Sequence, residues 1–491
     1  MSLTPSLQSL PGRRLRRTDA LHGLVTVLAA GMVGRLGLSE WVRPEMILLV
    51  VPVVIAAALV LRHPKWCVVG VVAGSVFGTY RSGFDVGTFT LRPTDAFLAL
   101  LAGWALHLRI KEGRTPTSRV GQLQLGLLLL VFGMSLLTTV GDPTGVLEPL
   151  SSLLRLGLTF ALAWLVPYAI REREDRMFLL RATAVLVAAE LLNAVFLKAH
   201  DGGRLTGSNG PNVEGLLAVV LLVAVLNLPL FGRYVRLAMG VLAAVALVQA
   251  ESIASVTALA LALGAYGIRV AVGSPRASAL VRPARIMMLV VGGFLLVASV
   301  RPDDVPRGGG FDASSTAVRV TLGYAGLTVF SEHPVLGVGW QRSSRAITSE
   351  AVVAKVRGRF TRVRTDVLRA GEPGVTVHNA YIQVLAESGL VGFGILAAGV
   401  LVGRRGIREL VAGAGSDAEV GRTLMMSLFV ILVWWNDNAL FGSQPEAVLF
   451  AFFLGLLASI GLQTKGGGTS AASRSAPEPM AVEAATAPER A

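Results

Sequence analysis

Residues 213–231 read VEGLLAVVLLVAVLNLPLF, nineteen residues of which only Glu214 is charged. A helix that crosses the hydrocarbon core of a bilayer needs about 20 mostly apolar residues, and this stretch has that length and character. Similar runs recur along most of the 491-residue chain, which is 53% hydrophobic and only 15% charged. A soluble domain carries roughly 25% charged residues, so this composition excludes a soluble multidomain enzyme and a disordered chain.

Fourteen such runs predict an all-α, polytopic integral membrane helix bundle. The predicted spans are residues 21–38, 44–62, 66–82, 93–110, 121–140, 151–171, 178–199, 213–231, 234–251, 253–272, 284–300, 381–402, 421–440 and 446–463. The first and third are short and contain glycine, so twelve transmembrane helices is the alternative count. A cleavable signal peptide over residues 13–34 is the alternative for the first span.

Basic residues in the short loops orient the predicted bundle in a cytoplasmic (inner) membrane. Arg13, Arg14, Arg16 and Arg17 precede the first span, and basic residues return in every second short loop, which predicts two cytoplasmic termini. The net charge of +14 follows this topology, so we expect membrane lipids and no nucleic acid as partners. The predicted parts are a basic N-terminal tail (1–20), a transmembrane bundle (21–300), an extracytoplasmic loop (301–380), C-terminal transmembrane helices (381–463) and a disordered cytoplasmic tail (464–491).

The 301–380 loop is unusual because it holds eleven basic and seven acidic residues on the side where the short loops are poor in basic residues. Within it, residues 352–368 place valines and Phe360 on one helical face and basic side chains on the rest. This pattern predicts a basic amphipathic helix on the outer membrane surface, attracted to a phosphate-bearing lipid or a polyanionic acceptor. A solvated charged face is the alternative.

Residues 333–340 of the same loop read HPVLGVGW and follow Arg319 and an apolar stretch. Pro334, Gly337 and Gly339 are typical of a helix end and of a close backbone approach.

A second stretch, HNAYIQVLAESGLVG, begins at His378 and leads from the loop into the predicted span 381–402. The pKa of an imidazole suits proton transfer near neutral pH, so His378 is a candidate acid or base. An intramembrane carboxylate such as Glu387 is expected to face the bundle interior, and Gly389 and Gly392 are small enough to let helices approach closely.

A third stretch, GRLTGSNGPN at residues 203–212, precedes span 213–231 on the same predicted side and holds Arg204 and Asn212. From this stretch alone, a tight extracellular turn is the plainer interpretation. The chain has no Walker A motif, dinucleotide fingerprint or HExxH, and Cys67 is its single cysteine. These features predict no metal site and no cofactor, and a donor that is already activated on a lipid.

At these stretches the chain resembles the O-antigen ligase and O-antigen polymerase superfamily of polytopic membrane proteins. The 203–212 stretch resembles the family's Arg-x-x-Gly…Pro-Asn turn, and Arg319 with HPVLGVGW resembles its Arg…His-Pro-x-x-Gly-x-Gly segment. His378 and Asn379, nine residues, and then Gly389 and Gly392 resemble its most specific pattern. The resemblance covers roughly residues 90–463. It departs at Val256, because the family often has arginine after the serine that corresponds to Ser255.

The resemblance implies a GT-C-like, metal-independent and inverting glycosyltransferase of cell-surface polysaccharide biosynthesis. The donor would be a glycan on undecaprenyl or a related polyprenyl pyrophosphate, and the acceptor a glycan, lipid or protein. His378 would be the general base and Arg319 would neutralise the pyrophosphate. Arg204, Asn212, Arg345 and Asn379 would bind substrate, while His333, Pro334, Gly337, Gly339, Gly389 and Gly392 would shape the site. A transporter or flippase and a non-catalytic scaffold are the alternatives.

Overall fold

The structure is a computed structural model that describes residues 63–78, 84–86, 89–112, 147–170, 172–196, 205, 207–272, 313–360, 368, 376–413, 417–436, 438–440 and 444–472. Predicted spans 21–38, 44–62, 121–140 and 284–300, the basic tail 1–20, Arg204 and the last part of the C-terminal tail lie outside these residues.

The secondary structure of the described residues is helical apart from one short hairpin, which agrees with the all-α prediction. The helices are α3 (Lys65–Val76), α4 (Pro93–Glu112), α6 (Leu147–Ala169), α7 (Arg173–Phe196), α8 (Pro211–Asn227), α9 (Arg233–Ala250), α10 (Ile253–Val272), α12 (Ala313–Glu332), α13 (Ser343–Ile347), α14 (Glu350–Arg359), α15 (Ala380–Gly413), α16 (Ala418–Trp434) and α17 (Pro445–Ala472). In the hairpin, β1 (Phe84–Val86) pairs antiparallel with β2 (Phe89–Leu91).

Ten of the fourteen predicted spans fall on described helices. Among the described residues, three segments are both long and apolar enough to cross a membrane, namely Ser152–Ala169, Arg173–Phe196 and Arg233–Ala250. Shorter apolar helical segments accompany them at Lys65–Val76, Pro211–Asn227, Ile253–Gly264, Ala380–Ile395 and Pro445–Ile460.

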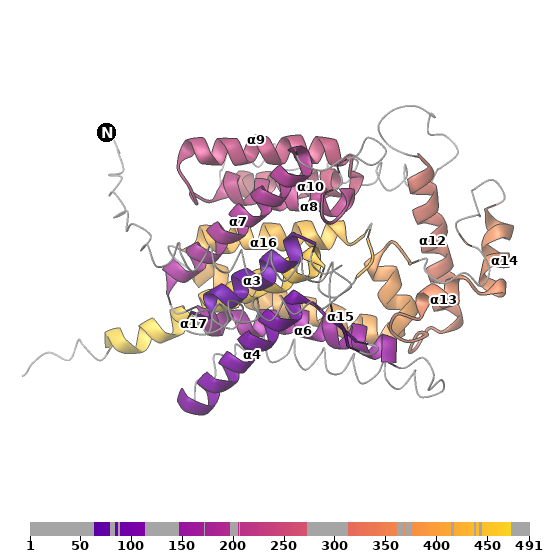
Figure 1. Ribbon diagram of the computed structural model, residues 1–491, viewed down its shortest axis with the longest axis horizontal. Helices are drawn as coiled ribbons and strands as arrows, with labels where there is room; N and C mark the ends of the chain where they lie inside the picture. Colours follow the sequence, from indigo (N-terminus) through magenta and orange to yellow (C-terminus); the bar gives the residue numbers. More distant parts are fainter. Residues whose placement is uncertain are drawn as a thin grey trace, which may run out of the picture.

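Helix α8 runs through the main core, whereas α9 lies at its edge (Figure 1). Nearly all of α8 between Glu214 and Val225 is buried, as expected for a helix that is apolar all round. Helix α9 packs against α8 yet exposes one apolar face, formed by Tyr234, Val235, Leu237, Val241, Val245 and Val248. An exposed apolar face of this kind suits contact with lipid chains.

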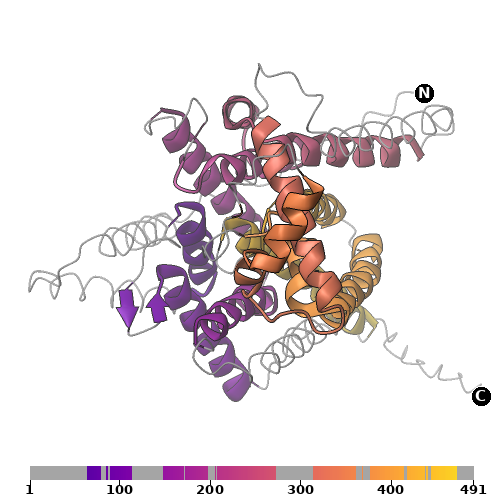
Figure 2. The same ribbon diagram turned by 90° about the vertical axis from the view of Figure 1, so that its right-hand side faces the viewer.

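Helices α12, α13 and α14 gather at one end of the bundle, which we call the α12 end. Helix α12 crosses this end steeply, and a view onto it shows α12 and its neighbours lying over the middle of the bundle (Figure 2). A second, smaller core lies here, which we call the small core. Its buried members are Leu322, Ala325, Val329, Ile347, Val352, Val353, Val356, Leu368, Val377 and Ala386.

The small core corrects the prediction of a surface helix over residues 352–368. Helix α14 ends at Arg359, and its buried Val352, Val353 and Val356 pack against protein rather than facing lipid. The Ser349 hydroxyl caps the helix by accepting from the Val352 N–H, and Lys355 pairs with Glu332 of α12 at 2.6 Å. Because the apolar face is used inside the protein, the basic face alone is left exposed.

Three further predictions need correction at their boundaries. Helix α3 ends at Val76, where Gly78 turns the chain with φ of 68°, and so stops before the predicted end of span 66–82. Helix α17 continues to Ala472, into the tail predicted to be disordered from residue 464. Extending a formed helix adds one hydrogen bond per residue without a new nucleus, so it can run on into a polar segment. Span 381–402 is not one continuous helix, because α15 breaks at Gly389.

Candidate active site at the α12 end

The small core brings the two predicted catalytic residues into one neighbourhood. Leu322 lies one turn after Arg319 on α12, and Val377 directly precedes His378. Both apolar residues are buried in the same small core, so Arg319 and His378 lie near its edge. Ile347 of α13 belongs to this core too, and Arg345 of the same helix is exposed.

His378 is exposed, and Arg319 is close enough to act on it electrostatically. Two causes lower the pKa of His378 below its ordinary value. The larger is the partial removal of the imidazole from water by neighbouring protein atoms, and the second is the positive charge of Arg319. A lowered pKa keeps the imidazole neutral at neutral pH, which is the form a general base requires. The electrostatics therefore suit the role that the sequence predicts for His378.

Asn379 connects the His378 segment to the end of α16. Its side-chain oxygen accepts from the Ile382 N–H and so caps α15, while its amide donates to the Asn436 carbonyl oxygen at 2.7 Å. The Ala380 N–H donates to the Trp435 carbonyl oxygen at 2.9 Å. The structure therefore shows Asn379 positioning His378, and its predicted contact with substrate stays a prediction.

The 333–340 loop binds α15 through backbone hydrogen bonds where that helix breaks. The N–H groups of Val338 and Gly339 donate to the carbonyl oxygens of Ala386 and Glu387, each at 2.9 Å. In return, the Leu390 N–H donates to the Pro334 carbonyl oxygen at 2.8 Å. Two stretches singled out in the sequence thus form one unit.

Glycines are required on both sides of this contact. A Cβ on Gly389, whose φ is 64°, would lie 2.2 Å from the Val335 carbonyl oxygen. A Cβ on Gly337, whose φ is 68°, would lie 2.4 Å from the carbonyl carbon of Glu387. Gly389 was predicted to allow two helices to approach closely. In the structure it instead allows the 333–340 loop to lie against α15, and a Cβ on Gly392 would contact only the Ser388 side chain of its own helix.

The remaining residues of the 333–340 loop end α12 and start the next turn. His333 continues the hydrogen bonding of α12 by donating to Val329 and is exposed, as is Pro334. Gly339 adopts φ of 97°, and Trp340 donates its indole N–H to the Ser152 hydroxyl of α6 at 3.3 Å. These residues connect the α12 end to the main bundle.

Glu387 faces the interior, as predicted, with 1% of its surface exposed. Its carboxylate accepts from the hydroxyl of Ser343 and from the side-chain amide of Gln383, the latter at 3.4 Å. Gln383 also accepts from the Leu440 N–H at 2.8 Å, so the network reaches the link between α16 and α17.

The 207–212 segment is connected to the His378 segment through hydrogen bonds to the end of α16. The Asn212 carbonyl oxygen accepts from the indole N–H of Trp434 at 3.2 Å and from the Ser255 hydroxyl at 3.4 Å. Trp434 adjoins Trp435, which binds Ala380, so Asn212 and His378 are joined through the end of α16. The adjacent Val256, where the family often has arginine, is 45% exposed.

Glu190 and Glu214 form a pair of buried carboxyl groups beside this segment, and the sequence analysis did not predict this pair. Glu190 of α7 accepts from the Ser208 N–H at 2.6 Å, and Glu214 of α8 accepts from the Asn209 N–H at 3.2 Å. A Cβ on Gly207 would lie 2.2 Å from one Glu214 oxygen and 2.8 Å from a Glu190 oxygen, so the two carboxyls are neighbours. The two residues come from different helices, so the sequence alone gives no sign that they meet.

Arg155 of α6 pairs with Asp95 of α4, at 3.8 Å. Within the described part of the chain, no three His, Cys, Asp or Glu side chains gather as a metal site would need.

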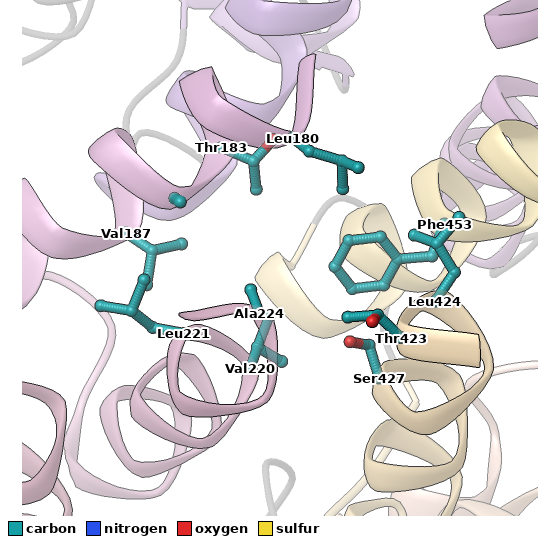
Figure 3. Close-up of a pocket in the computed structure, with 11 residues that line it drawn as sticks. Leu180, Thr183, Val187, Val220, Leu221, Ala224, Thr423, Leu424, Ser427 and Phe453 are labelled. Atoms are coloured by element: carbon teal, nitrogen blue, oxygen red, sulfur yellow. The ribbon is translucent and has the colours of Figure 1, made fainter. Parts of the chain in front are cut away.

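One pocket lies apart from these residues, between α7, α8, α16 and α17 (Figure 3). Its lining is apolar except for Thr183, Thr423 and Ser427. None of the lining residues is titratable, so the pocket offers no acid or base.

No protein-family model matches the chain, and no curated protein matches it either.

Proposed function

We propose that this chain is an O-antigen ligase-like membrane glycosyltransferase. It transfers or polymerises a glycan from a polyprenyl (undecaprenyl) pyrophosphate donor, in cell-surface polysaccharide biosynthesis. The proposal places twelve to fourteen helices across the inner membrane, both termini in the cytoplasm and the α12 end on the outer face. The acceptor is a glycan, a lipid or a protein.

One observation carries the proposal: a cation and a weakly basic imidazole stand together at the rim of the small core. Arg319 acts electrostatically on His378, whose pKa is lowered, so one residue is suited to phosphate and the other to an acceptor hydroxyl. Guanidinium groups bind phosphates strongly through paired hydrogen bonds. A lipid pyrophosphate moves laterally in the bilayer and can reach such a site at the membrane surface.

The reaction divides between these two residues. His378 removes the proton from the acceptor hydroxyl as its oxygen attacks the anomeric carbon of the donor sugar. The bond from that carbon to the pyrophosphate breaks at the same time, which inverts the configuration. Arg319 stabilises the negative charge that develops on the departing polyprenyl pyrophosphate, and stabilisation of developing charge is usually the largest catalytic contribution.

The test uses the full chain in lipid nanodiscs with a polyprenyl-pyrophosphate-linked glycan. His378→Ala and Arg319→Ala should each lower transfer by about 10²-fold or more, while the protein still inserts and folds. His107→Ala and Arg109→Ala are matched controls, because both side chains are exposed on α4, far in sequence from the site. Full activity of both His378→Ala and Arg319→Ala would refute the mechanism.

A deletion strain separates the two reactions of the family. Accumulation of a lipid-linked polymer would identify a ligase, and accumulation of single lipid-linked repeat units would identify a polymerase. Mass spectrometry of the extracted glycolipids makes this distinction.

A further inference from the structure

An apolar patch is exposed where the loop after α12 meets α15. It is formed by two loop residues and two helix residues, Val335, Leu336, Leu390 and Val391, and we call it the loop–α15 patch. Val335 is 60% exposed and Leu390 is 58% exposed. The two sides of the patch are neighbours, because the Leu390 N–H donates to the Pro334 carbonyl oxygen and the Val391 N–H donates to the Val335 carbonyl oxygen. Apolar side chains gathered in this way at a surface mark a contact with another molecule or with lipid.

The backbone behind the patch is hydrogen-bonded within the protein. The N–H groups of Val338 and Gly339 donate to α15, and the Gly337 N–H donates to the His333 carbonyl oxygen at 3.1 Å. Non-helical backbone is costly beside hydrocarbon, because no water is present there to bind its N–H and C=O groups. Hydrogen bonds to α15 reduce this cost, so the loop can lie at the edge of the hydrocarbon region with its apolar side chains outward.

Helix α15 continues the apolar surface beyond the patch. Residues Ala380–Ile395 form one of the shorter apolar helical segments of the structure. Predicted span 381–402 contains both helix residues of the patch. Because the loop side chains extend the surface by which α15 would enter the bilayer, the patch favours lipid over a protein partner.

The charge beside the patch suits anionic lipid headgroups. Lys355 of α14 pairs with Glu332, which lies three residues before Val335. At 100° per residue, Arg359 follows Lys355 on the same flank of α14, whereas Arg357 lies on the opposite flank of the buried face. All three basic side chains are exposed. One flank of α14 therefore presents cations towards the loop that carries the patch.

We infer that the loop–α15 patch is embedded in the outer leaflet of the membrane, with Lys355 and Arg359 directed to the phosphates of anionic phospholipids beside it. The inference rests on the proposed placement of the α12 end at the outer face, and it goes beyond the proposed reaction. It makes part of the predicted extracytoplasmic loop 301–380 a membrane-embedded element. The α12 end is then held at the level of the bilayer along which a lipid substrate moves.

Single cysteines that carry an environment-sensitive fluorophore show which residues touch lipid. Val335→Cys and Leu390→Cys are compared with Ala354→Cys, which is exposed on the side of α14 away from the small core. The full chain is placed in nanodiscs, and the wild-type chain gives the background, because its Cys67 is buried. Phospholipid with a doxyl group on its acyl chain should quench the two patch positions, and aqueous iodide should quench position 354.

The choice of lipid headgroup tests the charged flank. With the fluorophore at position 335, doxyl-labelled phosphatidylglycerol should quench more strongly than doxyl-labelled phosphatidylcholine. Arg359→Gln should lower this preference about fivefold, because one cation near the surface attracts anionic lipid by about that factor. Arg357→Gln is the matched control on the opposite flank and should leave the preference unchanged. An equal loss in the two variants would refute the assignment of the flank.

The remaining outcomes also decide. Iodide quenching at position 335 as strong as at position 354 would place the patch in water and overturn the inference. Protection of position 335 from both quenchers would show that protein, such as a second copy of the chain, covers the patch, and would overturn it too. These measurements do not depend on glycan transfer, so a patch quenched by lipid in a chain that transfers no glycan would leave the inference standing while the proposed function fails.

A membrane-impermeant maleimide tests the placement that both proposals share. It should react with Ala354→Cys in intact spheroplasts. Reaction only after the cells are lysed would place the α12 end in the cytoplasm and overturn both proposals.

Discussion

The 207–210 turn and the 333–340 loop both contain glycines and both lie near buried carboxyl groups, yet they are held in different ways. The 207–210 turn donates its N–H groups to the side chains of Glu190 and Glu214. The 333–340 loop pairs its backbone with the backbone of α15 and uses the Glu387 side chain only for the residues that follow. One is therefore a contact of backbone with side chains, and the other is a contact of backbone with backbone.

This difference determines how each site should respond to added atoms. A carboxylate at the end of a flexible side chain can rotate away from a new methyl group, although it then loses hydrogen bonds. A carbonyl group in a paired backbone cannot move without breaking its neighbours' hydrogen bonds. Glycine substitutions therefore distinguish the two kinds of contact directly.

Gly389→Ala should have the largest effect. The new methyl group would lie 2.2 Å from the Val335 carbonyl oxygen, and the residue would keep a positive φ of 64°. Left-handed strain of roughly 1–2 kcal/mol and overpacking of about 1–3 kcal/mol together predict a loss of about 3 kcal/mol in the free energy of unfolding. Thermal unfolding of the detergent-solubilised protein measures it. Gly394→Ala is the control, because a Cβ there meets nothing within 4 Å, and equal stability of the two variants would contradict the backbone contact.

Gly207→Ala should have a smaller effect, about 1–3 kcal/mol. The methyl group would meet the oxygens of Glu214 and Glu190 at 2.2 and 2.8 Å, but both are side-chain ends that can shift. The same unfolding measurement applies, with Gly157→Ala as the control in open space. A loss as large as that of Gly389→Ala would show that the carboxyl pair is as rigid as the backbone contact, and the comparison would then fail.

The helical part of the fold was predictable because apolar runs of membrane-spanning length depend only on composition. Ten predicted spans fall on helices, and α10 matches its predicted limits. The break at Gly389 was not predictable from hydropathy, because it depends on a loop some fifty residues earlier in the chain that approaches the helix. Helix α14 was misplaced for a related reason: its valines look the same in sequence whether they meet lipid or another helix.

The structure brings together some of the residues that the sequence singled out. Arg319 acts electrostatically on His378, and Gly337 and Gly389 lie at one backbone contact, while their roles in a reaction stay predictions. The carboxyl pair was not predicted, because Glu190 and Glu214 come from different helices and meet only in the folded bundle. The role of Asn379 as the cap of α15 depends on local sequence, whereas its hydrogen bond to the Asn436 carbonyl oxygen needed the end of α16 to be placed beside it.

Arg319→Gln tests the electrostatic effect of Arg319 on His378, next to the 333–340 loop. The positive charge of Arg319 contributes to the lowered pKa of His378, so removing that charge should raise the pKa. A general base is active when it is deprotonated, so the acidic limb of the pH–rate profile should move to higher pH. Arg319→Lys keeps the charge and should leave the limb in place. NMR titration of labelled histidine, with His378→Gln to assign the signal, gives the pKa even where transfer is lost, and an unchanged pKa in Arg319→Gln would contradict the coupling.

Val256→Arg should have the smallest effect and tests the 207–212 side. Val256 is 45% exposed and lies in the first turn of α10, next to the Ser255 hydroxyl that binds Asn212. An arginine there has room, and a cation at a helix N-terminus costs only about 0.3–1 kcal/mol.

Val241→Arg is the matched contrast, because Val241 is 55% exposed in the middle of the apolar face of α9, where a charge in lipid costs roughly 2.5–3.5 kcal/mol. If the α12 end is at the outer membrane surface, Val256→Arg should unfold within about 1 kcal/mol of wild type and bind polyprenyl pyrophosphate at least as tightly. Equal destabilisation of the two variants would instead place Val256 in lipid and remove the 207–212 segment from the proposed site.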